Sequence, residues 1–310
     1  MKKRNYSFLL LSVLLVACGG GNTPSTPSSS ISSISSYSSL SSSSSIESIS
    51  SIKTYSDPVV ESRSSAIKAY DATTKESDLL KVDDSPLPYR LYVPDNYDGD
   101  TYHYPLFVFL HGAGERGNDN SLQLKNAVQN MFNDLDSPLY QSIAIFPQCP
   151  SNGTNRSQWV DTPWSEGNYS IDDVEESDDI KAVLEIMKTV KENYNINNRR
   201  VYIMGVSMGG FGTWDLLTRH TKDFTAGIPL CGGGDPSYAA NLVYTPIWTV
   251  HGAKDSVVPV EGTREMVDAI QMARGTLIKY TELPNEDHNV WDYASTNYEM
   301  IDWLFSQVKN

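Results

Sequence analysis

Cysteine is rare in this sequence, and the spacings by which cysteine and histidine usually bind zinc are missing. Only three cysteines occur among 310 residues, and none stands in a paired motif of the zinc-binding type. The glycine pattern of a phosphate-binding loop is also absent, and no internal repeat is evident. We therefore expect no metal ion, nucleotide or other cofactor.

Basic residues are scarce as well. The chain has 38 acidic residues against 24 basic ones, which gives a formal net charge of −14, and no basic cluster follows the first four residues. A nucleic-acid partner would need a basic surface, so none is expected. The acidity by itself indicates a well-solvated surface and no particular function.

The apolar run near the beginning of the chain, Phe8 to Ala17, is too short to span a bilayer comfortably. It follows three basic residues, as in a bacterial export signal. It ends in Leu15-Val16-Ala17-Cys18-Gly19, which resembles the lipobox of bacterial lipoproteins. The resemblance implies that residues 1–18 are a lipoprotein signal and that Cys18 carries a membrane anchor. The alternative is an ordinary cleaved signal with a chance cysteine.

Serine dominates the next segment. Residues 19–65 contain too few large apolar side chains to offset the entropy lost on folding, about 1 to 2 kcal/mol per residue. They are predicted to form a flexible linker. Residues 66–310 are then one domain of ordinary size, exported and held at the cell surface or in the periplasm.

Short apolar runs alternate with helical stretches in the remainder, which is typical of a mostly parallel sheet with helices on both faces. The predicted strands are Tyr89 to Pro94, Leu106 to His111, Ile143 to Pro147, Val201 to Gly205, Gly227 to Leu230, Ile247 to Gly252 and Thr276 to Leu283. The predicted helices are Ser121 to Asn133, Asp172 to Tyr194, Gly209 to Arg219, Glu261 to Ala273 and Asn297 to Val308. In this strand order Cys149 and Cys231 lie about 14 Å apart, too far for a disulfide. We expect two free thiols.

One segment has the pattern of a nucleophile elbow. The apolar strand from Val201 runs into Gly205-Val206-Ser207-Met208-Gly209 and then into a helix. Small residues on either side of the serine permit the sharp turn that exposes its hydroxyl at the top of a sheet. A GxSxG motif alone is weak evidence, but a preceding strand and a following helix make it specific. Ser207 is the predicted nucleophile.

A second apolar strand ends in His111-Gly112-Ala113-Gly114, upstream of the elbow. In α/β hydrolases a backbone N–H of this loop and one from the residue after the nucleophile bind the oxyanion of acyl transfer. Ala113 and Met208 are the predicted oxyanion-hole residues. His111 is expected to order the loop without carrying protons.

A serine nucleophile of this kind works in a triad with an acid and a histidine. In the chain these two should follow the serine in the order acid, then histidine. Asp255 comes just past the end of the strand Ile247 to Gly252, and His288 lies in a polar loop after the next strand. These two are the predicted acid and base. Asp287 is a weaker candidate for the acid, because it adjoins the histidine that it would have to orient. The other histidines, at positions 103, 220 and 251, are not expected to reach Ser207.

The elbow, the HGxG loop and the triad order make residues from about Leu79 to Val308 resemble α/β-hydrolase esterases. Three segments make the resemblance to one group of these esterases more specific: His111 to Gly117, Pro147 to Pro150 with Trp159 after it, and Gly205 to Trp214. They look like the esterase D and polyhydroxybutyrate-depolymerase-like group, which includes feruloyl and acetylxylan esterases. The resemblance implies hydrolysis of acyl esters on plant xylan through an acyl-enzyme, without cofactor.

The segment from Gln148 to Ser170 is the expected specificity element, because it is long, aromatic and at the catalytic edge. Trp159 and Trp164 are predicted to contact an acylated polysaccharide, although packing beneath the loop is an equally good reading. Three alternatives stay open for the function: a short-chain polyester or general esterase, a prolyl-oligopeptidase-like peptidase, and a catalytically dead surface binding lipoprotein.

Overall fold

The computed structural model of the protein describes residues 80–83, 85–134, 136–151 and 159–310. The predicted signal, the Cys18 anchor and the serine-rich linker lie outside the described residues. Their assignments stay predictions.

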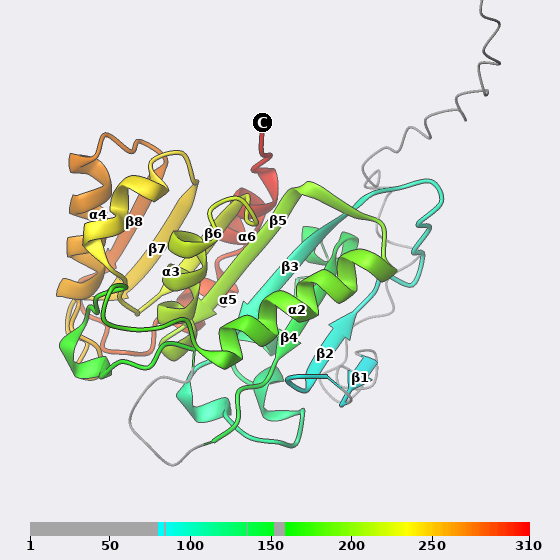
Figure 1. The fold of residues 1–310 in the computed structure, drawn as a ribbon, viewed down its shortest axis with the longest axis horizontal. Helices are drawn as coiled ribbons and strands as arrows, with labels where there is room; N and C mark the ends of the chain where they lie inside the picture. Colours follow the sequence, from blue (N-terminus) through cyan, green and yellow to red (C-terminus); the bar gives the residue numbers. More distant parts are fainter. Residues whose placement is uncertain (1–79, 84, 135, 152–158) are drawn as a thin grey trace, which may run out of the picture. The chain divides into compact units, whose positions relative to one another are not determined.

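The described chain is built on one eight-stranded sheet (Figure 1). Its order is β1-β2-β4-β3-β5-β6-β7-β8; β2 is antiparallel to both β1 and β4, and all other neighbours are parallel. The strands are β1 (Leu80–Val82), β2 (Tyr89–Tyr92), β3 (Tyr104–Leu110), β4 (Ile143–Pro147), β5 (Ile196–Val206), β6 (Ala226–Leu230), β7 (Ile247–Gly252) and β8 (Ile278–Leu283).

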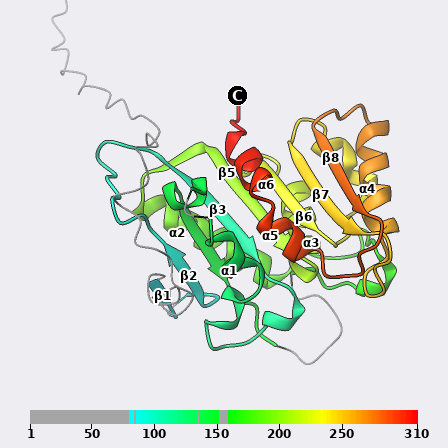
Figure 2. The same cartoon turned by 180° about the vertical axis from the view of Figure 1, so that it is seen from behind.

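Helices cover both faces of this sheet, seen from opposite sides in Figures 1 and 2. The helices are α1 (Ala127–Met131), α2 (Asp178–Asn193), α3 (Met208–Arg219), α4 (Glu261–Met272), α5 (Trp291–Thr296) and α6 (Tyr298–Ser306). Apolar residues of α2, α3 and α4 share one core cluster, and those of α1, α5 and α6 share another. The predicted fold class is confirmed.

The central strands are apolar throughout because both of their faces are buried. In β3, Leu106 and Val108 point into the first cluster, while Phe107 and Phe109 point into the second. This alternation follows from the two-residue repeat of a strand. It explains why the central strands appear in the sequence as uninterrupted apolar runs.

Several helix predictions differ from the structure in their bounds. The helix expected over Ser121 to Asn133 is split into a 3₁₀ turn at Leu122–Leu124 and the short α1, because Asn126 has φ of 56° and ψ of −111°. Helix α2 begins at Asp178, later than expected, because the Ser177 hydroxyl accepts a hydrogen bond from the amide of Ile180 and caps it. Strand β1 and helix α5 were not predicted.

Two parallel strands at the centre of the sheet, β3 and β5, bring the HGxG loop beside the elbow. Helix α3 packs on the end of β3 at Gly209, where an added Cβ would lie 1.9 Å from the carbonyl oxygen of Leu110. Only glycine permits α3 to approach the end of β3 so closely. The sheet therefore positions the two predicted halves of the oxyanion hole next to each other.

His111, at the carboxyl end of β3, is buried and 1% exposed. Its Nδ1 lies 2.6 Å from the Gly112 carbonyl, and its Nε2 accepts a hydrogen bond from the amide of Cys149 at 3.0 Å. Burial lowers the pKa of His111 to about 4. The ring therefore ties the loop after β3 to the loop after β4, which is the structural role expected for it.

Cys149 and Cys231 are both free and buried, as expected. They follow β4 and β6, which are separated in the sheet by β3 and β5. Burial raises the pKa of each thiol well above its usual value, so both remain protonated.

Replacing Gly209 tests the close approach of α3 to β3. Gly209→Ala should lower the free energy of unfolding by about 1 to 3 kcal/mol, because the added methyl group must displace backbone. The matched control is Gly114→Ala, where nothing lies within 4 Å of the added carbon. Urea unfolding curves for the two variants provide the comparison, and equal losses of stability would contradict the packing argument.

The buried histidine predicts a pH dependence of stability. Below its ordinary pKa of 6.5 the unfolded chain binds a proton at His111 that the folded chain does not bind, down to about pH 4. The free energy of unfolding should therefore fall over this range by up to roughly 3 kcal/mol. Urea unfolding at pH 7.0, 5.5 and 4.5 should show a weaker dependence in His111→Gln. An unchanged pH dependence in that variant would refute this role of His111.

Candidate active site

Ser207 lies at a strained turn between β5 and α3. Its φ is 57° and its ψ is −115°, a conformation that non-glycine residues rarely adopt. The turn is held from both sides, since the Ser207 amide donates to the Leu230 carbonyl and the Phe211 amide donates to the Ser207 carbonyl. This is the geometry of a nucleophile elbow, in which the surrounding fold offsets the local strain.

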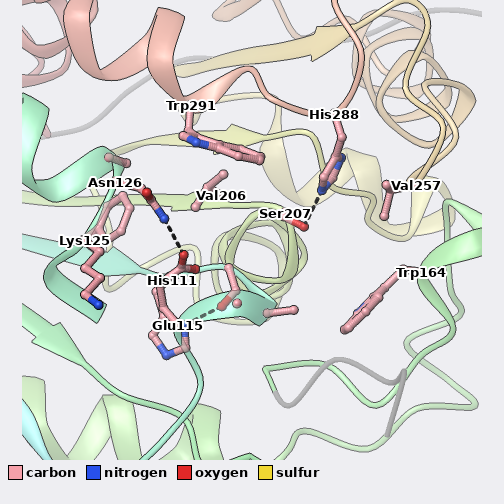
Figure 3. Close-up of a pocket in the computed structure, with 15 residues that line it drawn as sticks. His111, Glu115, Lys125, Asn126, Trp164, Val206, Ser207, Val257, His288 and Trp291 are labelled. Atoms are coloured by element: carbon pink, nitrogen blue, oxygen red, sulfur yellow. Dashed lines mark hydrogen bonds between the residues drawn. The ribbon is translucent and has the colours of Figure 1, made fainter. Parts of the chain in front are cut away.

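The structure brings the three predicted triad residues into one hydrogen-bonded chain, of which Figure 3 shows the bond between Ser207 and His288. The Ser207 hydroxyl oxygen lies 2.8 Å from His288 Nε2, and His288 Nδ1 lies 2.7 Å from Asp255 Oδ2. These distances allow Nε2 to take a proton from the serine while Nδ1–H stays bonded to the carboxylate. The arrangement can therefore generate a serine nucleophile.

Asp255 has a fully buried side chain that is nonetheless suited to remain ionised. Its Oδ1 accepts hydrogen bonds from the amides of Val257 and Val258 at 2.9 and 2.8 Å. Burial alone would raise the pKa of Asp255, but hydrogen bonds from His251, His288 and the Val258 amide outweigh it and hold the pKa well below its usual range. A permanent negative charge is thus available to stabilise the imidazolium of His288.

Asp287, the weaker candidate for the acid, has a different place. Its carboxylate accepts hydrogen bonds from the amide and hydroxyl of Ser256 and from the amide of His288. It therefore ties the histidine loop to the loop after β7. Bonds from the Ser256 amide lower the pKa of Asp287, which keeps this link ionised.

The loop predicted to supply half of the oxyanion hole lies directly beside the serine. A Cβ placed on Gly112 would be 3.7 Å from Ser207 Cβ. Ala113 begins a 3₁₀ turn, η1 (Ala113–Glu115), and lines the pocket at Ser207, while Met208 is the first residue of α3. Both residues lie where the prediction requires, and their oxyanion role stays a prediction.

A pocket of about 300 Å³ opens at Ser207 and His288. Figure 3 shows Trp164 and Val257 on one side of the serine and Lys125 and Asn126 on the other, with Trp291 above. Apolar side chains make up much of its wall: Phe109, Ala113, Ala127, Trp164, Val206, Val257 and Trp291. Such a pocket suits a small apolar group attached to the reacting carbonyl.

The two tryptophans predicted to contact substrate occupy different environments in the structure. Trp164 lines the pocket, where the Arg116 guanidinium lies 5.6 Å from the centre of its ring and orients it. Trp159 is fully buried, donates Nε1–H to the His111 carbonyl, and packs edge-on against the His111 ring. Its prediction as a substrate contact was wrong, because the indole is fully buried against His111. Tyr169, also buried, donates its hydroxyl to Asp215.

Sequence reasoning missed two side chains that line this pocket, Trp291 and Asn126. Trp291 packs edge-on against His288, with 5.7 Å between ring centres, and its position three residues after the histidine was a usable signal. Asn126 donates Nδ2–H to the Glu115 carboxylate at 2.7 Å, across the end of the pocket. Nothing in the sequence indicates the positive φ of Asn126 or its pairing with a residue of the HGxG loop.

Among residues 80–83, 85–134, 136–151 and 159–310, no group of three or more His, Cys, Asp or Glu side chains is arranged to hold a metal ion. The same part of the chain contains no helix whose length and apolar character would suit a membrane span.

Several proteins of known name are similar to this chain. A bifunctional acetylxylan esterase/xylanase, XynS20E of Neocallimastix patriciarum, is 27% identical over 170 residues, which are 54% of this chain and 21% of that enzyme. A probable feruloyl esterase C of Aspergillus niger is 25% identical over 203 residues, covering 66% of this chain and 67% of that protein. The chain thus spans about a fifth of the first relative's length.

Among solved structures, a thermostable esterase aligns with a TM-score of 0.63 and 35% identity, covering 75% of this chain and 64% of that one. A feruloyl esterase module from Clostridium thermocellum, complexed with sinapinate, has a TM-score of 0.52 at 15% identity over 75% of this chain and 88% of its own, and this likeness shows the fold alone. The sequence model described as Phospholipase/Carboxylesterase matches residues 97–294. The chain belongs to this family of α/β hydrolases and is related at low identity to feruloyl and acetylxylan esterases.

Proposed function

We propose that the protein is a serine carboxylic ester hydrolase that releases feruloyl or acetyl groups from plant cell-wall polysaccharide. The observation that carries the proposal is the hydrogen-bonded chain from Ser207 through His288 to Asp255 at the mouth of an apolar pocket. That chemistry attacks a carbonyl carbon, and the pocket beside it accepts an uncharged acyl group.

In the proposed first step, Ser207 Oγ attacks the ester carbonyl while His288 Nε2 takes its proton. The backbone N–H groups of Ala113 and Met208 stabilise the oxyanion of the tetrahedral intermediate. His288 then gives its proton to the sugar oxygen as the bond between that oxygen and the acyl carbon breaks, so the sugar leaves with a free hydroxyl and the acyl group stays on Ser207. Asp255 remains ionised throughout and stabilises the imidazolium.

In the second step a water molecule attacks the acyl-enzyme. His288 Nε2 takes a proton from the water as its oxygen bonds to the acyl carbon. The proton passes to Ser207 Oγ as the acyl bond breaks, which releases the carboxylic acid and restores the serine. Apart from the ester and one water molecule, both proposed half-reactions use only groups of the chain.

Two observations favour a plant polysaccharide ester. The relatives at 25 to 27% identity are named as acetylxylan and feruloyl esterases. The pocket also carries two indole rings, Trp164 and Trp291, near Ser207 and His288. Aromatic rings pair with a phenolic acyl group or pack on the apolar face of a sugar.

Location is a further part of the proposal. The export signal and lipobox pattern at residues 1–18 favour a lipid anchor at Cys18, and the serine-rich linker would keep the catalytic domain clear of the lipid. A polysaccharide is too large to enter the cell, so an enzyme acting on it needs an external position.

The activity is tested with the purified domain lacking residues 1–65, on methyl ferulate, acetylated xylan and p-nitrophenyl acetate. Ferulate or acetate should be released from the plant substrates. Ser207→Ala should reduce each activity at least about 1000-fold, because the acyl-enzyme cannot form. Hydrolysis of the nitrophenyl ester alone would keep the serine chemistry but reject the polysaccharide substrate. Turnover of proline-ended peptides in its place would identify a peptidase.

Trp164 tests the acyl pocket. Trp164→Leu should raise the KM for methyl ferulate about fivefold, because losing an aromatic contact costs about 1 kcal/mol, and should change kcat/KM for p-nitrophenyl acetate less than twofold. Tyr244→Leu is the matched control, since this tyrosine is 89% exposed and outside the pocket. Equal losses on both esters in Trp164→Leu would exclude a role in acyl recognition.

A further inference from the structure

A second histidine contacts the triad carboxylate from the interior of the protein. His251 lies on β7 and is 0% exposed. Its Nε2 is 3.0 Å from Asp255 Oδ2, the same oxygen that lies 2.7 Å from His288 Nδ1. Two imidazole rings therefore share one carboxylate oxygen, one from the core and one from the pocket.

The surroundings of His251 determine which of its nitrogens carries a proton. Nε2 faces two acceptors, Asp255 Oδ2 and the Val258 carbonyl at 3.1 Å. A nitrogen between two oxygen acceptors is stable there only when it carries a hydrogen. His251 therefore donates Nε2–H toward the carboxylate.

The other side of the His251 ring is held by α4. Its Nδ1 lies 2.8 Å from the Thr263 hydroxyl, and that hydroxyl lies 2.9 Å from the Gly232 carbonyl. Thr263 is fully buried, so water does not compete for these bonds. The ring plane is consequently set by α4 and the loop after β6, both distant in sequence from Ser207.

Asp255 is thereby bound on all sides. The amides of Val257 and Val258 hold Oδ1, and the two histidines hold Oδ2. Without His251, two backbone bonds to Oδ1 would still permit the carboxylate to tilt about that oxygen. Such a tilt displaces Oδ2, and with it the Nδ1 anchor that aims His288 at Ser207.

We propose that His251 is a positioning residue of the triad, which fixes Asp255 Oδ2 so that His288 faces Ser207. The inference rests on the proposed function, because it concerns the same serine chemistry. His251 touches neither substrate nor the serine and acts only through Asp255. Catalysis depends strongly on such second-layer contacts, since small displacements of a reacting group cost large factors in rate.

The experiment measures kcat and KM for p-nitrophenyl acetate in His251→Leu and His251→Gln, each in the wild-type and Asp255→Asn backgrounds. His251→Leu removes the donor at similar volume and should lower kcat at least 10-fold with KM within twofold. His251→Gln offers its amide nitrogen near the place of Nε2 and should keep at least a third of kcat. In the Asp255→Asn background, His251→Leu should lower kcat less than threefold. A residue that acts only through the Asp255 carboxylate has little further effect once that carboxylate is removed.

Equal losses in His251→Leu and His251→Gln, or the same factor for His251→Leu in both backgrounds, would overturn the proposal. His103 immediately precedes β3, whereas the HGxG loop follows that strand. His103→Leu is therefore the matched histidine control and should leave kcat unchanged. Ser207→Ala in the same assay separates the two hypotheses: if it retains activity, the proposed function fails, whereas its inactivity leaves only the positioning role in question.

A measurement on the wild-type protein covers the case in which His251→Leu does not fold. Long-range ¹H–¹⁵N correlation spectra should show an exchange-protected proton on Nε2 of His251, assigned by its loss in His251→Gln. That proton signal should shift in Asp255→Asn. A His251 ring without a proton on Nε2 would overturn the proposal independently of any kinetic result.

Discussion

The close packing of the elbow helix on the end of β3 is the constraint on which the site depends. Gly209 permits α3 to reach the carbonyl of Leu110, and this contact places Met208 and the HGxG loop on either side of Ser207. The strained backbone of Ser207 persists because the sheet, the helix and the Leu230 carbonyl all hold it. A side chain at position 209 would separate these parts.

The site also depends on an electrostatic constraint, which is the buried carboxylate of Asp255. A carboxylate removed from water is stable as an anion only when several donors surround it. Here the donors come from its own loop, from His288 at the pocket and from His251 in the core. The same bonds that keep Asp255 charged also orient the histidine next to the serine, so structural and catalytic requirements coincide.

Much of the fold and the placement of the triad residues could be predicted because they depend on local patterns. Buried parallel strands appear as apolar runs, and Gly205 to Gly209 marks the elbow at one place in the chain. The helix expected over Ser121 to Asn133 could not be predicted correctly. Its periodicity is helical, but Asn126 takes a positive φ there and interrupts it beside the pocket.

The sequence by itself determined the order of strands β2 to β8 and of helices α2, α3, α4 and α6, the strand-to-helix turn at Ser207 and the positions of Asp255 and His288 past strand ends. Those features follow from the repeat of apolar residues and from glycine at a turn, both local properties. Only the tertiary structure decided which tryptophan of the loop faces the pocket: Trp164 lines it, whereas Trp159 is buried against His111. The same holds for His251, because contacts between residues far apart in the chain depend on how the strands and helices pack, which no local pattern records.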